Sequence, residues 1–236
     1  MNKKKILTLS LVVAVIAIAM VSGSLAWFTD SDQVTNVFTV GSVKIVQNEE
    51  FQQNSQLMPI VPHASDPTDP SKAGNFVTKK VDVSNVGKNA AYIQTFVAVP
   101  AVLDNNNILE IYDANAAANG WTKTAAPVAT GVSGTQILPG SGDTNLYNIY
   151  KYAYNSALAV NTTTADVIEG VYINADVDLD VLDAATAYFV VNGSQVTGFN
   201  ALETVNVYVA TQAIQVDGFE NAASALATFD THPWAS

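Results

Sequence analysis

Apolar and polar residues alternate with a period of two in seven stretches of this 236-residue chain. Such alternation is typical of β-strands that bury one face and leave the other in water. The same stretches are rich in Val, Ile, Thr and Tyr, which favour pleated, half-buried surfaces. We therefore predict strands at residues 38–46, 77–83, 91–99, 146–154, 167–173, 187–191 and 204–214.

The segments between these stretches predict turns, long loops and two short helices. A Ser, Asn and Gly cluster at 84–89 predicts a hairpin between the strands on either side of it. Residues 107–118 mix Leu, Glu and Ala before Asn119-Gly120, which is typical of a helix C-terminus, and apolar residues at 219–229 have near-helical spacing, so both segments are expected to be helical or irregular. Segments 47–75 and 125–144 are rich in Pro, Asn, Ser, Gly and Asp, so we expect surface loops there. Together these elements predict an all-β fold with minor helices, a two-sheet jelly-roll sandwich that forms a single domain over residues 47–236.

The first 26 residues have the pattern of a signal peptide. Lys3, Lys4 and Lys5 precede an apolar run at 6–21, which is shorter than the roughly 20 residues that span a bilayer. Ser24-Leu25-Ala26 places small residues where signal peptidase cuts, so we expect cleavage between Ala26 and Trp27. An uncleaved N-terminal anchor is the alternative. Cleavage implies a secreted protein that has no membrane segment afterwards.

Charge and composition exclude one class of partner. The formal net charge is −11, and it falls to about −14 when three of the ten lysines leave with the leader. The chain contains no arginine, whereas proteins that grip phosphate backbones use Arg forks and a basic face. We therefore expect no nucleic-acid binding. Cysteine is absent too, and a domain of this size can bury enough apolar surface without disulfides.

Three blocks of sequence carry a family resemblance. The junction "SLAWFTDSDQVTNVFTVGSVKI" has a small-residue site, an aromatic pair, Thr-Asp, and then a Phe-Thr-x-Gly strand. "VDVSNVGKNAAYIQTFVAVP" and "VNVYVATQAIQVDGFENAASAL" lie in the middle and near the C-terminus. All three resemble the TasA/camelysin family of secreted biofilm-matrix fibre proteins of Gram-positive bacteria, whose members carry a SipW-type signal peptide. The resemblance covers about half of the chain and implies a jelly-roll domain, export and fibre formation.

The same resemblance implies that residues 27–46 are a donor strand, which completes the sheet of the next subunit. A free strand can pair with an open sheet edge through its backbone while alternate side chains fill pockets. Burial of Trp27 and Phe28 would contribute roughly 1.5–3 kcal/mol each. The expected donor residues are Trp27, Phe28, Val34, Val37, Phe38 and Val40. In the alternative, 38–46 is the first strand of the domain itself, and 27–37 is a tail.

These patterns predict an exported structural protein of the extracellular matrix or cell surface that assembles with itself into filaments. Its other expected partners are the signal peptidase and a minor matrix or anchor protein. A monomeric secreted surface-binding module or adhesin, built on the same fold, is the alternative from another class.

Candidate chemistry is sparse, and we expect neither an enzyme nor a cofactor. Camelysin-type proteins have been described as metallopeptidases, which keeps that activity as a third reading. Only His63 and His232 could serve a zinc site, and they form no His-Glu-x-x-His motif. Asp176, Asp178 and Asp180 have the spacing of a calcium loop, but the Gly and Glu positions of that loop are filled by other residues, so we expect a solvated strand face instead. Tyrosines 150, 152 and 154 would share one strand face and pack across strands.

Overall fold

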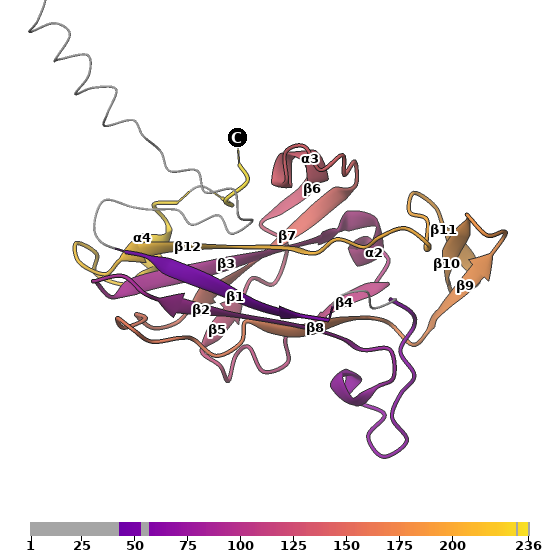
Figure 1. Ribbon diagram of the computed structural model, residues 1–236, viewed down its shortest axis with the longest axis horizontal. Coiled ribbons are helices and arrows are strands. Elements are labelled where there is room, and N and C mark those ends of the chain that lie inside the picture. The colour runs from indigo at the N-terminus through magenta and orange to yellow at the C-terminus, as the bar shows by residue number, and fades with distance from the viewer. Residues whose placement is uncertain (1–42, 53–56, 230, 236) are drawn as a thin grey trace, which may run out of the picture. The chain divides into compact units, whose positions relative to one another are not determined.

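The computed structural model describes residues 43–52, 57–229 and 231–235, and these form an all-β fold with few short helices (Figure 1). The helical segments are η1 (Pro70–Lys72), α2 (Ala101–Asn105), α3 (Gly134–Ile137) and α4 (Ala222–Leu226). The strands are β1 (Ile45–Phe51), β2 (Val77–Asn85), β3 (Ala91–Pro100), β4 (Leu109–Tyr112), β5 (Trp121–Lys123), β6 (Ala129–Ser133), β7 (Leu146–Tyr154), β8 (Ile168–Ile173), β9 (Val177–Val181), β10 (Ala187–Val191), β11 (Ser194–Val196) and β12 (Tyr208–Gln215).

The strands form three sheets, in which all strand pairs are antiparallel. One sheet has the order β1-β2-β8-β4, and a second has the order β12-β3-β7-β5, with β6 also paired to β7. A third sheet has the order β11-β10-β9. The first two sheets share one apolar core, to which β2, β8, β3 and β12 all contribute. The all-β prediction is confirmed, the third sheet is not part of the predicted two-sheet sandwich, and the jelly-roll connectivity stays a prediction.

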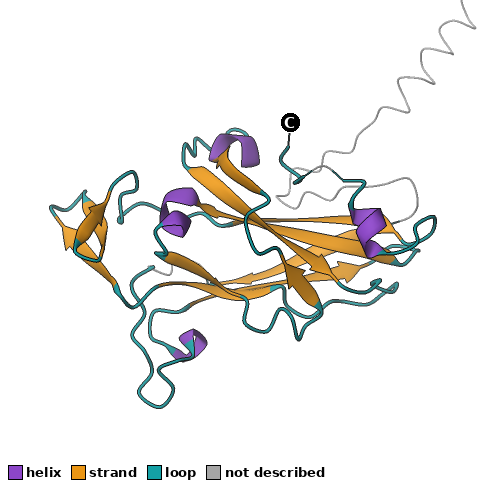
Figure 2. Ribbon diagram, turned by 180° about the vertical axis from the view of Figure 1, so that it is seen from behind, coloured by secondary structure: helices purple, strands orange, loops and turns teal. Residues whose placement is uncertain are grey.

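Strand β3 shows why two layers form around the second sheet. Its odd positions, including Ile93 and Val97, face the shared core. Its even positions face outward, where Phe96 joins a second apolar cluster and Tyr92 packs against a third. That third cluster includes Leu226 of α4, which covers the outer face of β3 and β12 (Figure 2). A strand buried on both faces is rich in apolar residues, and β3 is apolar apart from Tyr92 and the buried pair Gln94 and Thr95.

The predicted hairpin at 84–89 is wrong, because β2 and β3 belong to different sheets. Asn85 turns the chain inward: its side chain donates to the carbonyls of Asn89 and Leu158 and accepts from the Gly87 amide. Val83 and Ile93, on either side of this turn, are both fully buried in the shared core. The turn cluster therefore makes an arch between the sheets, which lets both strands bury their apolar faces against each other.

Other connections also differ from the sequence analysis. The predicted helix at 107–118 is strand β4 followed by turns, because β4 pairs with the buried strand β8. The predicted helix at 219–229 is helical only in α4. The predicted loop at 125–144 contains β6 and α3. The predicted loop at 47–75 begins with most of β1, so the proposed domain boundary after residue 46 falls inside a strand.

The predicted strands at 77–83, 91–99, 146–154, 167–173 and 187–191 are confirmed, with ends within two residues of β2, β3, β7, β8 and β10. The predicted strand at 204–214 overlaps β12 from Tyr208 onward.

The prediction that three tyrosines share one strand face is confirmed as well: Tyr152 lies in the shared core, and Tyr150 and Tyr154 pack against that core. The Tyr154 ring packs across the strands on Trp121, with 4.9 Å between ring centroids.

The topology gives the sandwich two distinct ends. At one end β1 begins beside the end of β2, and β12 ends beside the start of β3; we call it the exit end. At the other end the chain leaves β8 and forms the β9–β11 sheet before it returns to β12. We call this insertion, residues 174–206, the tip. The two ends lie on opposite sides in Figure 1.

Candidate assembly site

The predicted donor residues and the cleavage site lie outside the described residues. This holds for Ala26 and for the donor set Trp27, Phe28, Val34, Val37, Phe38 and Val40. The described chain starts at Val43, which is buried together with Ile45 in the shared core. Residues 27–42 therefore join the domain at the exit end, directly before an edge strand of the first sheet. No helix in the described ranges is long and apolar enough to cross a bilayer.

Strand β12 is the edge of the second sheet beside this junction. Among the described strands, it forms a ladder with β3 alone. The carbonyl of Val209 accepts a hydrogen bond from the Gln47 side chain of β1, so it points away from β3. Because backbone direction alternates along an antiparallel strand, the backbone groups of Thr211 and Gln215 also point outward. These groups have the orientation that a further strand would pair with.

Charge separates β12 from the other long edge strands. Proteins blunt exposed edges with charged side chains, which discourage pairing with another chain. Strand β1 carries Glu49 and Glu50, β9 carries Asp178 and Asp180, and β4 and β5 carry one charge each. The eight residues of β12, "YVATQAIQ", carry none. The uncharged edges β6 and β11 have only five and three residues. Within the described residues, β12 is thus the longest edge strand without a charge.

A buried polar chain links β1 to β12 across the edge of the sandwich. The Thr211 hydroxyl lies 3.0 Å from the Thr95 hydroxyl and donates to Gln47 Oε1 at 2.7 Å. The Gln47 amide donates in turn to Glu49 at 2.6 Å. Lys79, whose side chain is only 8 % exposed, completes the chain with an ion pair to Glu49 at 2.7 Å. Side chains rather than a backbone ladder therefore hold these two edges together.

Tyrosine–carboxylate pairs brace the second sheet. Burial, with the Asp104 carboxylate nearby, raises the pKa of Tyr150 to about 12. Burial raises the pKa of Tyr152 still further, and its hydroxyl donates to Asp113 at 2.6 Å. Groups that hold their protons this firmly are hydrogen-bond donors at neutral pH, so they fix β7 to α2 and to the loop after β4.

The Asp143 carboxylate accepts several hydrogen bonds, two of them from tyrosines. Burial opposes its ionisation, but hydrogen bonds from Tyr147, the Asn145 amide, Tyr208 and Asn206 outweigh burial and lower the pKa of Asp143. The Tyr147 and Tyr208 hydroxyls lie 2.6 and 2.8 Å from the same carboxylate oxygen. This carboxylate ties the loop before β7 to the start of β12.

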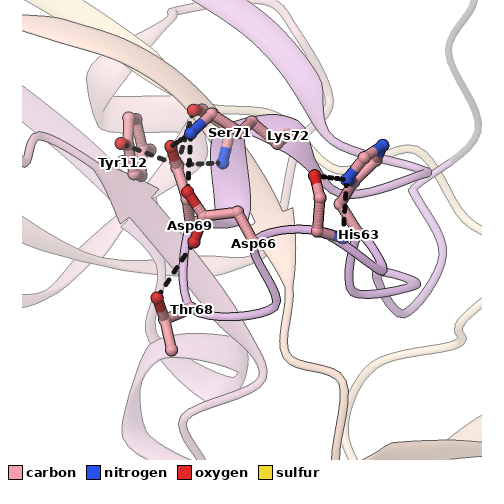
Figure 3. Close-up of polar contacts among 8 residues, drawn as sticks. His63, Asp66, Thr68, Asp69, Ser71, Lys72 and Tyr112 are labelled. Atoms are coloured by element: carbon pink, nitrogen blue, oxygen red, sulfur yellow. Dashed lines mark hydrogen bonds and ion pairs between the residues drawn. The ribbon is translucent and has the colours of Figure 1, made fainter.

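The loop between β1 and β2 has its own charged cluster (Figure 3). Lys72 lies 2.6 Å from Asp66 and 3.1 Å from Asp69. Hydrogen bonds from Ser71, and then from Lys72, lower the pKa of Asp69 to about 2. The Tyr112 hydroxyl of β4 also donates to Asp69. These contacts hold the loop in shape and connect it to the first sheet.

The residues considered for metal chemistry do not come together. His63 hydrogen-bonds Ser65 in the loop of Figure 3, at 2.8 Å, whereas His232 is buried near Trp234 in the C-terminal segment. Asp178 and Asp180 lie on strand β9, as the strand-face prediction requires, whereas Asp176 lies in the turn before it. In the described part of the chain, no group of three or more His, Cys, Asp or Glu side chains could hold a metal ion.

Two features of the site were missed in the sequence. Gln47 and Thr211 occupy inward positions of β1 and β12, where alternation predicts apolar residues. The signal was present, because a polar residue at an inward position needs a buried partner. Only the pairing of the strands identifies that partner. Comparison of the chain with models of protein families and with curated proteins finds no match in either set.

Proposed function

We propose that this protein is an exported structural subunit, which assembles with itself into filaments at the cell surface or in the extracellular matrix. In this proposal, the segment at 27–42 of one copy adds as a strand to the β12 edge of the next. The observation that carries the proposal is the uncharged, eight-residue β12, which among the described strands forms a ladder with β3 alone and whose Val209 carbonyl points away from β3, toward Gln47 of β1. The resemblance to the TasA/camelysin family supports export and fibre formation.

The dimensions and direction of the chain suit this contact. Sixteen extended residues span roughly 50 Å, about twice the length of an eight-residue strand. Strand β12 runs from the tip to the exit end. A segment that enters from the tip end, with its C-terminal end still joined to its own β1, runs antiparallel to β12. A contact of this kind repeats head to tail without closing, and such contacts produce filaments.

Electron microscopy and light scattering of the chain that begins at Trp27 test the proposal. We expect filaments from this chain. A matched variant, in which residues 27–42 are replaced by Gly and Ser at the same length, should remain monomeric. A synthetic peptide of residues 27–42 should shorten the filaments by capping them, and a scrambled peptide should not.

Hydrogen exchange locates the contact. Assembly should protect the outward amides of Val209, Thr211 and Gln215 more than the amides that already bond to β3. Filaments formed by the Gly/Ser variant would exclude the donor role. Single particles at high concentration of the unaltered chain would favour the surface-binding module instead.

A further inference from the structure

The tip carries an exposed apolar patch on a strongly acidic insertion. Val181 ends β9 and is 61 % exposed, and Leu182, which follows it directly, is 58 % exposed. Leu202, 46 % exposed, follows a turn that Asn200 ties to the end of the β9–β10 hairpin, through hydrogen bonds with Ala185 and Ala187. Three of the nine exposed large apolar side chains of the described residues therefore belong to one small sheet and its adjoining turn.

The charge of the tip disfavours a symmetric contact through this patch. Residues 174–206 contain five acids, and no lysine, arginine or histidine. Two tips that met face to face would place like charges together, which costs free energy. A surface of different charge suits the patch better.

The exit end of the same chain offers such a surface. Lys44 and Lys88 are exposed there, and neither forms an ion pair with the described residues. Val86, which is 45 % exposed, is close to both lysines. It lies two residues before Lys88, and its amide donates a hydrogen bond to the Lys44 carbonyl. Asp217 and Glu220 follow β12 at the same end, so its charges balance where the tip is purely acidic.

We propose that the tip is a second assembly surface, on which Val181, Leu182 and Leu202 pack against the exit end of another copy. Lys44 and Lys88 of that copy lie against the acids of the tip. The inference rests on the proposed self-association and adds a contact between folded domains to the exchanged strand. The two contacts are geometrically compatible, since a copy that sends its N-terminal segment in from the tip end has its own exit end on that side.

Charge reversal tests the pairing, with the concentration needed for assembly as the readout. K44E/K88E and D178K/E203K should each raise that concentration by about tenfold at low salt, since each removes two surface ion pairs and adds repulsion. All four changes in one chain restore the native net charge and should restore assembly. The matched control joins D178K/E203K to K80E/K151E, which also restores the net charge but leaves the exit end unchanged; it should stay impaired.

The apolar part is tested separately. Leu182→Ser should raise the assembly concentration, and Leu146→Ser, at a similarly exposed position beside β6, should not. Circular dichroism checks that each variant is folded. If the assembly concentration depended on net charge alone, or if K44E/K88E assembled at the native concentration, this inference would be wrong. Neither result would contradict strand addition. An unaltered chain that never associates would overturn both.

Discussion

The buried hydroxyl of Thr211 offers the sharpest test of how β1 and β12 are joined. Thr211→Val keeps the shape of the side chain and removes the group that links Thr95 to Gln47, at 3.0 and 2.7 Å. Thr211 is 1 % exposed and Gln47 is 5 % exposed, so water cannot readily replace the lost partner. A buried polar group without a partner costs about 1–3 kcal/mol. We expect the free energy of unfolding to fall by about 2 kcal/mol.

Urea denaturation of the Trp27-initiated chain, at concentrations where it is monomeric, measures this loss. With a slope of about 2 kcal/mol per molar urea, the midpoint should fall by about 1 M. The double variant Gln47→Leu with Thr211→Val removes both partners, and such paired removal is nearly neutral when the shape is kept. Its loss should therefore be smaller than the sum of the single losses by at least about 1 kcal/mol. A single variant within about 0.3 M of the native midpoint, roughly a third of the expected shift, or strictly additive losses, would refute the linked chain.

Three further results are expected from the packing and the titrating groups. Gly170→Ala should cost about 1–3 kcal/mol of unfolding free energy, because its new Cβ would lie 2.3 Å from Phe76 Cζ and 2.6 Å from the Val77 carbonyl; Gly74→Ala, whose nearest atom lies at 3.6 Å, is the control and should cost little. The lowered pKa of Asp143 means that its contribution to stability is present above its ordinary value of 3.8 and is lost as the pH falls below it, so Asp143→Asn should flatten the acid side of a melting-temperature profile; an unchanged profile would contradict this. Ultraviolet titration should find Tyr150 and Tyr208 ionising near pH 12, and Tyr147 and Tyr152 only on unfolding; release of all nine tyrosines near pH 10 would show that the carboxylate pairs do not form.

The sequence predicted strands best where one face is buried and the other is wet. In β2 the buried inward positions from Val77 to Val83 are valines except for Lys79, which pairs with Glu49, and only one register puts the valines in the core. The tyrosines of β7 were placed on the correct face for the same reason. Local patterns are enough for such strands, because side-chain direction alternates with each residue.

The pairing of strands could not be predicted in the same way. The turn at 84–89 has hairpin chemistry, but the burial of Val83 and Ile93 in one core required an arch between sheets. Residues 107–118 contain good helix formers, yet β4 is a strand because Ile111 lies opposite Val171 of β8. That partner is distant in the chain, so a local window cannot detect it.

In the candidate site, too, local features could be predicted from the sequence and features that depend on strand pairing could not. The lack of charge in β12 can be seen in the sequence, whereas its position at the edge depends on its pairing with β3. Gln47 is the first residue of a predicted loop, because its partners Val209 and Thr211 lie more than 160 residues away and do not enter a local pattern. The donor residues before Val43 stay a prediction.

The late position of β12 in the chain has a consequence for biogenesis. The side chain of Gln94 in β3 hydrogen-bonds Gln212, which lies 118 residues later in the chain. Gln47 hydrogen-bonds Thr211, which lies 164 residues later. A nascent chain therefore holds β3 without one of its two neighbours until synthesis is nearly complete. In the proposed assembly, the surface that would receive another molecule is completed last, after the segment that would be donated, so an unfinished chain would not yet present that surface.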